Sequence, residues 1–436
     1  MLGRLGFWMV MALAVVGPVL LLTYMPWWAL LATLLLLAAW MASTRIGQQS
    51  WSVTQVGIAT IPQRLGSSSV VVIGIAGVVG VLIAVLAMAA GFETTLRETG
   101  TDDTVVVTRA GAQTELNSII DQDTAVVVTQ AKQVLHNAAG QPIASPELVV
   151  IASLPKKSDG LDANVEIRGV GQRAWELRPG VKVIAGRKFT PGLRELIAGK
   201  RAVGQFKNLQ IGSTMKLNGQ LWTLVGEFDS ADAHNSEIWG DADVVASAYR
   251  RGGTRTSVNM KLTDRGEFEA LKAALTTDPR IKVDVSTTRD YYNRQSENLT
   301  RAIRILAITV GIIMAVGAVF GALNTMYAAV ATRAREIATL RAIGFRGLPV
   351  IVSVLFETML LAVFGGALGA GLAWAIFDDY TASTLSNFSQ VVFAFNVTPG
   401  LLWNGLKWAL AIGFIGGLFP AVRAARVSVT AGLREL

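Results

Sequence analysis

The sequence predicts a polytopic α-helical membrane protein of about six spans, with a large α+β extracytoplasmic domain inserted between them. Two observations lead to this fold class. First, 52% of the 436 residues are hydrophobic and only 16% are charged, with a mean hydropathy of +0.46, whereas average chains carry about 25% charge. Second, the apolar residues lie in long blocks that are separated by one long polar segment, residues 91–298.

The composition also limits the chemistry of the chain. It contains no Cys, and its two histidines, His136 and His234, lie far apart in the sequence. Disulfides, thiolate nucleophiles and Cys- or His-rich metal sites are therefore not expected. We expect no catalytic residue and no metal in this chain. An enzyme built on carboxylates is the weakest interpretation, because the spans contain almost none.

Residues 1–45 are predicted to form an N-terminal transmembrane hairpin. The segment Phe7–Ala42 has no charged residue and is interrupted near its middle by Tyr24, Pro26 and two tryptophans. About 20 apolar residues cross a bilayer, and Trp and Tyr favour its edges, so the pattern indicates two spans joined by an interfacial turn. A cleaved signal peptide with Arg4 in its n-region is the alternative. It is disfavoured because no good small-x-small cleavage site precedes the second apolar run.

The rest of the chain divides into three parts. Residues 46–92 combine an amphipathic segment, Gln49–Leu65, with the first core span. Residues 93–298 form the extracytoplasmic domain, and residues 299–436 form a membrane domain of three spans. The four core spans are expected at about residues 69–90, 303–331, 348–377 and 401–421.

The segment 91–298 has the composition of a soluble α+β domain, with 26 basic and 26 acidic residues. Three runs rich in β-branched residues predict strands, at Thr104–Thr108, Ala125–Thr129 and Leu148–Ala152. The spacing of apolar residues in Glu267–Leu275 predicts an amphipathic helix.

The charge distribution predicts the orientation of the chain. Because the segment 91–298 is neutral, the whole formal charge of +8 lies in the membrane portion. With six spans, ten arginines from Arg4 to Arg434 fall on one side, and the loop 378–400 on the other side has no Lys or Arg. The positive-inside rule places both termini in the cytoplasm and the large domain outside the plasma membrane, which is the periplasm in a two-membrane bacterium. The positive charge is thus a topology signal and does not indicate nucleic acid.

The segment 332–346 is the most informative stretch. It reads Thr-Arg-Ala-Arg-Glu-Ile-Ala-Thr-Leu-Arg-Ala-Ile-Gly-Phe-Arg and joins two predicted spans. Ile337, Leu340 and Ile343 recur at helical spacing beside a basic face. One interpretation is a positively charged turn that contacts the anionic headgroups of membrane lipid. The functional interpretation is a short helix parallel to the membrane that docks in a groove of a cytoplasmic partner.

These residues resemble a known family. The pattern R-x-R-E-I-A-x-L-R-A-I-G-F, the glycine-rich segment 365–371 and the ending 417–434 resemble the permease signature of MacB/FtsX-like ABC transporters. The segments 179–187 and 222–226 are similar to the family's MacB-type extracytoplasmic core domain. The resemblance covers about residues 50–436. The N-terminal hairpin is an addition to the family's usual four-span plan, and its role is open.

The resemblance implies a transmembrane permease subunit that dimerises with a second copy or a paralogue and binds a cytoplasmic ABC ATP-binding subunit. ATP and Mg would bind that partner and no cofactor is expected in this chain, which has no phosphate loop. Known members use mechanotransmission for efflux, for lipoprotein extraction or to activate cell-wall hydrolases, and a periplasmic adaptor or envelope protein is a further candidate partner. The coupling-helix positions implied by the resemblance are Arg333, Arg335, Glu336, Arg341, Ala342, Gly344 and Phe345.

Further residues are candidates for packing or for a polar site within the spans. Glu357 lies inside a span, where an ionisable group is a functional hypothesis by default. We favour a structural role in which it pairs with arginines near the cytoplasmic side. Four glycines have the i,i+4 spacing that suits close helix packing: Gly317, Gly321, Gly365 and Gly369.

Two alternatives remain from the sequence. The acidic loop with Asp229, Asp232, His234 and Glu237 has residue types that bind metals, although a solvated loop is the favoured interpretation. The whole chain could also be a membrane receptor or scaffold that regulates cell-wall or envelope proteins without transport. The sequence does not identify a cargo.

Overall fold

The structure is a computed structural model, and it describes residues 17, 18, 21, 24–386 and 389–426. The chain forms two compact units. Residues up to 89 together with 302–379 and 396–436 form the first, here called the membrane unit. Residues 90–301 and 380–395 form the second, here called the sheet unit. Each unit is described by itself.

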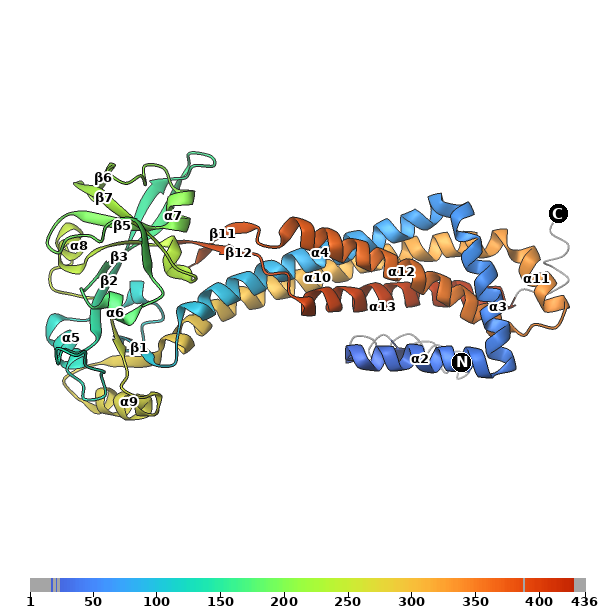
Figure 1. Ribbon diagram of the computed structural model, residues 1–436, viewed down its shortest axis with the longest axis horizontal. Coiled ribbons are helices and arrows are strands. Elements are labelled where there is room, and N and C mark those ends of the chain that lie inside the picture. The colour runs from blue at the N-terminus through green and yellow to red at the C-terminus, as the bar shows by residue number, and fades with distance from the viewer. Residues whose placement is uncertain (1–16, 19–20, 22–23, 387–388, 427–436) are drawn as a thin grey trace, which may run out of the picture. The chain divides into compact units, whose positions relative to one another are not determined.

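Four helices of the described chain are long and apolar enough to cross a membrane. They are α4 (Leu65–Thr99), α10 (Thr288–Thr332), α12 (Gly347–Phe377) and α13 (Pro399–Arg426). Their parts in the membrane unit run side by side (Figure 1). Each exceeds the roughly 20 residues that a bilayer requires, and each contains one of the four expected core spans.

The N-terminal region differs from a simple hairpin. Helix α2 (Trp27–Ser43) is followed directly by α3 (Arg45–Ala59), which is bent away from it by 103°. The bend occurs at Thr44, whose extended backbone ends α2 and whose Oγ1 accepts a hydrogen bond from the amide of Gly47. The described residues thus contain four candidate spans, or five if the bent pair is one. The first half of the predicted hairpin lies mostly outside the described residues, so a count of six stays a prediction.

Helix α3 packs against α12 through small side chains. Its buried residues are Gly47, Ser50, Val53, Thr54 and Gly57. The short helix η1 (Ile61–Arg64) then leads into α4. The predicted amphipathic segment is therefore helical, but its protein-facing side is formed mainly by small residues. Trp51 and Val56 are exposed.

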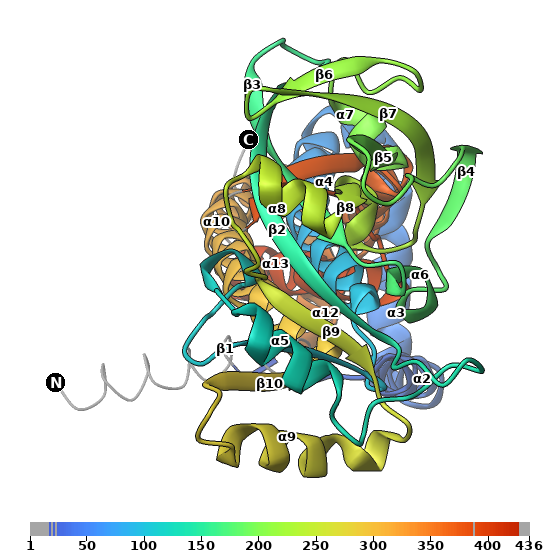
Figure 2. The ribbon, with the colours of Figure 1, turned by 90° about the vertical axis from the view of Figure 1, so that its left-hand side faces the viewer.

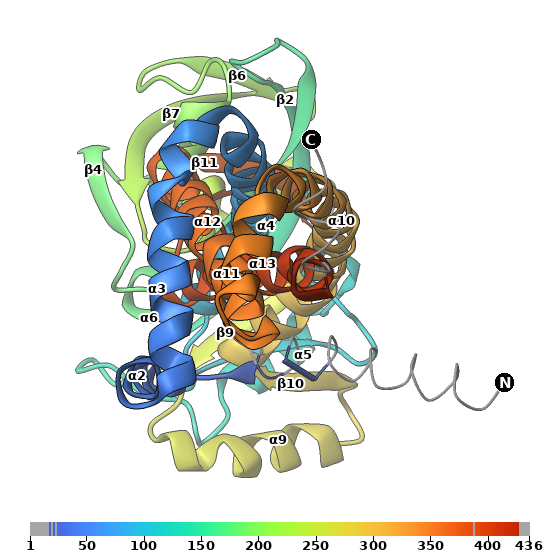
Figure 3. The same ribbon diagram turned by 90° about the vertical axis from the view of Figure 1, so that its right-hand side faces the viewer.

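A short helix, α11 (Ala334–Ala342), joins α10 to α12 and confirms the helix expected in the segment 332–346. It lies at the same end of the membrane unit as α3 (Figure 3). After Ile343 the chain turns at Gly344, whose φ of 105° is one that residues with a side chain rarely adopt. The turn directs the chain into α12.

The sheet unit is built on a ten-stranded sheet in the order β10-β1-β9-β2-β3-β8-β5-β7-β4, with β6 paired to β7. The pairs β3–β8 and β5–β7 are parallel and the other pairs are antiparallel. The strands are β1 (Thr104–Arg109), β2 (Ala144–Pro155), β3 (Asp162–Val170), β4 (Lys182–Gly186), β5 (Glu195–Gly199), β6 (Thr214–Leu217), β7 (Gln220–Asp229), β8 (Ile238–Asp241), β9 (Ser257–Lys261) and β10 (Val283–Thr287).

Strand β2 divides this sheet into two halves because it changes its partners along its length. Residues 144–147 pair with β9, whereas residues 148–155 pair with β3. One half has a core of Val105, Val258 and their neighbours, which α5 (Gln122–Thr129) and α9 (Phe268–Thr277) cover (Figure 2). The other half has a core around Ile167 and Trp222, beside α7 (Lys200–Gln205) and α8 (Ala242–Ala248).

Two of the three predicted strands are confirmed, in β1 and β2, and the helix predicted at Glu267–Leu275 is confirmed in α9. The strand predicted at Ala125–Thr129 is wrong, because this run belongs to α5. The side chain of Asp121 caps that helix by accepting the amide of Thr124, and Ala125 and Val128 are buried on one face. The cap and the single buried face outweigh the β-propensity of the valines.

Residues 380–395, predicted within the C-terminal membrane domain, instead belong to the sheet unit. They form a hairpin of β11 (Thr381–Ser386) and β12 (Ser389–Ala394). The amide of Val392 donates to Ser236 Oγ at 3.0 Å, and its carbonyl accepts from Nη1 of Arg201 at 3.0 Å. The sheet unit is therefore assembled from two separate stretches of the chain.

Candidate functional site

Helix α11 has a buried face and an exposed face. On the buried face, Ile337 and Ala338 are packed inside the membrane unit. Ile337 joins an apolar cluster with residues of α10, α12 and α13, among them Val330, Val354 and Ala421. Helix α11 is thus in contact with three of the spans through one small apolar surface.

The predicted coupling residues divide between these two faces. Arg335, Glu336, Ala342 and Gly344 are exposed, together with Thr339 and Ile343, and Ile343 is 69% exposed. Arg333 and Arg341 instead form bonds within the chain. Nη1 of Arg341 donates to the carbonyl of Ala425, on α13, at 3.0 Å. Phe345 is half-buried, and its amide closes the end of the helix by donating to the carbonyl of Leu340.

Arg333 occupies the N-cap position of α11 and forms two ion pairs. Its Nε lies 3.2 Å from Glu336 Oε2, and its Nη1 lies 3.3 Å from Glu357 Oε2. Glu357 also pairs with Nη2 of Arg64 at 2.9 Å. The carboxylate that the sequence placed inside a span is therefore buried and paired with two arginines, in the arrangement that the structural interpretation predicted.

The four predicted packing glycines behave in two ways. A Cβ on Gly369 would lie 2.4 Å from the carbonyl oxygen of Ala76, and one on Gly365 would lie 2.9 Å from that of Val72. These two glycines let α12 approach α4 closely, as predicted. A Cβ on Gly317 or Gly321 would meet no atom within 4 Å. Among the described residues of this chain, the close packing predicted for these two glycines of α10 is not made.

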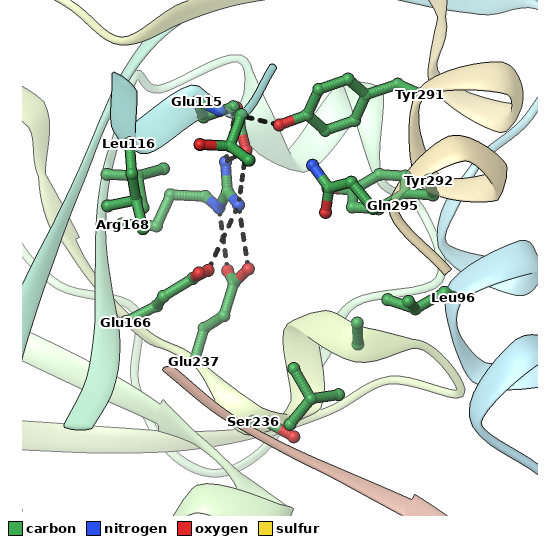
Figure 4. A pocket seen from close by; sticks show the side chains of 14 residues that line it. Leu96, Glu115, Leu116, Glu166, Arg168, Ser236, Glu237, Tyr291, Tyr292 and Gln295 are labelled. Atoms are coloured by element: carbon green, nitrogen blue, oxygen red, sulfur yellow. Dashed lines mark hydrogen bonds and ion pairs between the residues drawn. The ribbon is translucent and has the colours of Figure 1, made fainter. Parts of the chain in front are cut away.

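The sheet unit contains a buried ionic cluster around Arg168 that sequence reasoning missed. Nη1 of Arg168, on β3, lies 3.1 Å from Glu115, and its Nε lies 2.9 Å from Glu237 (Figure 4). The same Nη1 lies 3.1 Å from Glu147. Arg178 forms a second ion pair with Glu147 at 2.6 Å. Arg168 is 2% exposed and Glu147 is fully buried.

Neutral groups complete the hydrogen bonding of this Arg168 cluster. Glu115 accepts from Ser257 Oγ, and the amide of Glu115 donates to the phenol oxygen of Tyr291. Asn259 Nδ2 donates to Glu147. Trp239 Nε1 donates to Glu237 at 2.7 Å. A small cavity of about 40 Å³ lies beside the cluster, lined by Glu115, Arg168, Glu237, Tyr291, Tyr292 and Gln295 among others (Figure 4).

Burial and charge act against each other on these groups. Burial would raise the pKa of Glu237, but Arg168 and His234 lower it to about 2. Burial would likewise raise the pKa of Glu147, yet Arg178 and Arg168 hold it below its ordinary value. The pKa of Arg168 lies well above its ordinary value, because the attraction of Glu115 and Glu237 exceeds the effect of burial. These shifts favour the charged forms of Glu147, Glu237 and Arg168 at neutral pH.

The Arg168 cluster lies where β2 changes partners. Glu147 is paired with Ser257 of β9, and the next residue, Leu148, is paired with Gly169 of β3. The charges therefore occupy the boundary between the two apolar cores. The sequence offers one signal for this, because Glu147 and Arg168 each stand beside a run of buried apolar residues in their strands.

The acidic loop at 229–237 is not a solvated loop, so that prediction is wrong. Its residues 233–236 form the short helix η3 (Ala233–Ser236), and His234 and Glu237 are buried. His234 Nδ1 lies 3.0 Å from Asp232 Oδ2. The following residues 238–241 form β8. In the part of the chain that the structure describes, no group of three His, Asp or Glu side chains is arranged to hold a metal.

Taken together, these features define a class of protein: a multi-span membrane protein with a large outer α/β domain and a short helix between two spans. Two family models match the chain in consecutive stretches. The MacB-like periplasmic core domain matches residues 68–278, and the FtsX-like permease C-terminal domain matches residues 308–429. The chain belongs to the MacB/FtsX-like family of ABC transporter permeases. Membership indicates an inner-membrane protein with a periplasmic domain.

Curated relatives carry the name "Macrolide export ATP-binding/permease protein MacB". The protein of Neisseria meningitidis is 22% identical over 314 residues, which cover 66% of this chain and 47% of the relative. The protein of Photorhabdus laumondii is 24% identical over 306 residues, 65% of this chain and 45% of the relative. This chain spans about half the length of these relatives.

Two solved structures with similarity to the chain are domains that lie outside the membrane of their own proteins. The periplasmic region of MacB from Actinobacillus actinomycetemcomitans has a TM-score of 0.34 and 14% identity, covering 47% of this chain and 96% of that one. The extracellular domain of the transporter YknZ from Gram-positive bacteria has a TM-score of 0.32 and 13% identity, covering 42% of this chain and 100% of that one.

Proposed function

We propose that this chain is the transmembrane permease subunit of an ABC transporter and that α11 is its coupling helix. In this proposal a separate cytoplasmic ATPase binds ATP and Mg, hydrolyses the nucleotide and moves α11. The spans convey that motion to the periplasmic domain, which acts in efflux or in lipoprotein or lipid extraction. Both termini are cytoplasmic, and a second copy or a paralogue completes the transporter.

The observation that supports this proposal is the division of α11 into two faces. Arg335, Thr339, Ala342 and Ile343 are exposed on one side, here called the docking face. On the other side Ile337 packs among the spans, and Arg341 bonds to α13. A helix that moves a membrane domain needs both a surface that a partner can hold and firm attachment to the spans. The docking face combines the positive charge of Arg335 with the apolar side chain of Ile343, which suits an acidic groove with an apolar floor.

The name of the relatives suggests ATP as the energy source and a class of compounds as cargo. They are called ATP-binding/permease proteins that export macrolides, and this chain matches them over about half of their length. Since the family models that match here are a periplasmic core domain and a permease domain, we assign ATP binding to a partner. Apolar compounds that reach the periplasmic domain are the first cargo to test.

The experiment is purification of the full chain from its native membrane in mild detergent, followed by identification of stoichiometric partners. We expect an ATP-binding subunit to copurify with the wild-type chain. Combining Arg335→Glu with Ile343→Asp should reduce the amount of this subunit that copurifies by at least about tenfold. Such a loss corresponds to about 1.4 kcal/mol of binding free energy. The control is Lys182→Glu, which also replaces an exposed positive charge by a negative one, but in the sheet unit. We expect this variant to keep the partner bound.

Two substitutions in this loop are unsuitable for testing docking. Any residue at Gly344 is strained because of its positive φ, and Arg341→Glu breaks the bond to Ala425. Either change would disturb the membrane unit itself. If the wild-type chain carries no ATPase in several detergents, the receptor or scaffold alternative replaces this proposal, and the docking face should be tested for another cytoplasmic partner.

A further inference from the structure

Glu357 joins two arginines that belong to different elements of the membrane unit. Its Oε1 accepts from Nη2 of Arg64 at 2.9 Å, and its Oε2 accepts from Nη1 of Arg333 at 3.3 Å. The Glu357 side chain is 4% exposed, and those of Arg64 and Arg333 are 18% and 13% exposed. Each carboxylate oxygen therefore holds one arginine, and Glu357 is their shared partner.

The two arginines mark the beginnings of two helices. Arg64 is the last residue of η1, immediately before α4 starts at Leu65. Arg333 is the N-cap residue of α11. Helix α4 runs without a break to Thr99, and its residues from 90 onward are part of the sheet unit. Glu357 thus ties the start of the proposed coupling helix to the start of a helix that continues into the sheet unit.

The carboxylate is necessary for this connection. In the described chain the side-chain hydrogen bonds of Arg64 go to Thr60 and Glu357, and not to α11. Without Glu357, two positive charges would share a mostly buried corner and repel each other. Gly57 of α3 covers the site, since a Cβ there would lie 3.5 Å from Arg333 Nη1 and from Glu357 Oε2. Shielding from water strengthens both ion pairs.

We infer that Glu357 is a positioning residue that transmits displacement of α11 to α4. Movement of α11 carries Arg333 with it. The ion pairs must then either move together, which displaces Arg64 and the start of α4, or separate, which leaves buried charges without partners. Because separation is the costly alternative, the two helices move as a coupled pair. This inference rests on the proposed function, in which an ATPase moves α11.

The test is a double-mutant cycle read by hydrogen exchange on the full chain in detergent. The variants are Arg64→Gln, Glu357→Gln and their combination. The matched control is Glu336→Gln, which removes the exposed partner of Arg333. We expect Arg64→Gln to accelerate exchange of the α11 amides by about fivefold, although Arg64 has no hydrogen bond to α11. In the Glu357→Gln background the same change should add less than about twofold.

Two results would overturn the inference. One is unchanged exchange of α11 in Arg64→Gln, and the other is an undiminished effect of Arg64→Gln when Glu357 is already Gln. Helix α13 carries none of the residues of these ion pairs. Unaltered hydrogen exchange in α13 therefore shows that each variant is folded.

A second measurement separates this inference from the proposed function. In the complex with the ATPase, Glu357→Gln should retain the partner as the wild type does. The nucleotide-dependent change in hydrogen exchange at residues 90–99 should be at least about tenfold smaller in this variant than in the wild type. Loss of the partner from docking-face variants tests the proposed function alone. Should the wild type bind no ATPase, that function fails, and the exchange cycle still decides whether Glu357 links α11 to α4.

Discussion

Two buried ionic sites in the described structure use the same residue types for different purposes. In the sheet unit, Arg168 is surrounded by Glu115, Glu147 and Glu237, and each carboxylate also accepts a hydrogen bond from a neutral side chain. Among the described residues of the membrane unit, two arginines form ion pairs with Glu357, and both arginines remain partly exposed. The Arg168 cluster is a network with many redundant bonds, whereas the Glu357 site is a single junction.

This difference indicates what each site can tolerate. The Arg168 cluster fills the boundary where two apolar cores meet, so any missing partner leaves charge buried with no route to water. The Glu357 site has fewer partners and its arginines are partly exposed, so we expect its disruption to cost less than disruption of the Arg168 cluster, although it still leaves a buried carboxylate without a partner. A redundant network suits a domain that moves as one body, and a single junction suits elements that must shift.

The largest effect is expected for Arg168→Met. This change removes the only arginine that contacts all three carboxylates in the described structure, and we expect a loss of about 3 to 5 kcal/mol in the free energy of unfolding of the sheet unit. Thermal unfolding of the full chain in detergent, followed by the fluorescence of the tryptophans near the cluster, measures it. A loss below about 1 kcal/mol would show that the cluster does not hold the two halves together.

Acidification should produce the next largest effect. The pKa values of Glu237 and Asp232 are lowered to about 2 in the folded sheet unit, from ordinary values of 4.5 and 3.8. A carboxyl whose pKa is lowered by folding stabilises the protein above its unfolded pKa. That contribution is lost as the pH falls through the folded pKa. We therefore expect the sheet unit to lose on the order of 2 kcal/mol or more between about pH 4.5 and pH 2.

Urea titrations of the full chain at several pH values would measure this loss. The variant Glu237→Gln should show a flatter dependence of stability on pH in that range than the wild type. An equally steep dependence in the variant would mean that other carboxylates cause the acid sensitivity.

A smaller effect is expected for Glu357→Gln. The amide keeps the shape of the side chain, and both arginines are partly exposed, so we expect a loss of about 1 to 3 kcal/mol in stability of the membrane unit. Comparison of its melting temperature in detergent with that of Arg168→Met ranks the two sites. If Glu357→Gln were the more damaging change, the contrast between network and junction would be incorrect.

The smallest effect is expected for Glu336→Gln. Glu336 is 55% exposed, and its pair with Arg333 is a surface pair on one helix. Such pairs contribute about 0 to 1 kcal/mol, and we expect a change within about 0.5 kcal/mol. The same melting experiment in low and high salt measures it, because screening should remove what little effect there is.

Much of the membrane unit could be predicted because a bilayer imposes a simple rule on sequence. Long apolar blocks have few alternatives to helical spans, and the four core spans all appear as helices. The pattern of segment 332–346 likewise predicted α11. Local rules failed where other parts of the chain decided the outcome. The valines of Ala125–Thr129 became helical because of a cap and a buried face. The hairpin β11–β12 joined the sheet unit through contacts with Ser236 and Arg201.

The sequence by itself determined the fold class, the family resemblance and the position of the short helix, because hydropathy and local motifs are properties of neighbouring residues. Only the tertiary structure decided which arginines of that helix face outward, since Arg335 and Arg341 are alike in sequence but lie on opposite faces. It also decided that Glu357 meets Arg64, 293 positions away, and that Glu115, Glu147 and Glu237 surround one arginine. Contacts between residues so far apart depend on how the whole chain folds, and no local pattern records them.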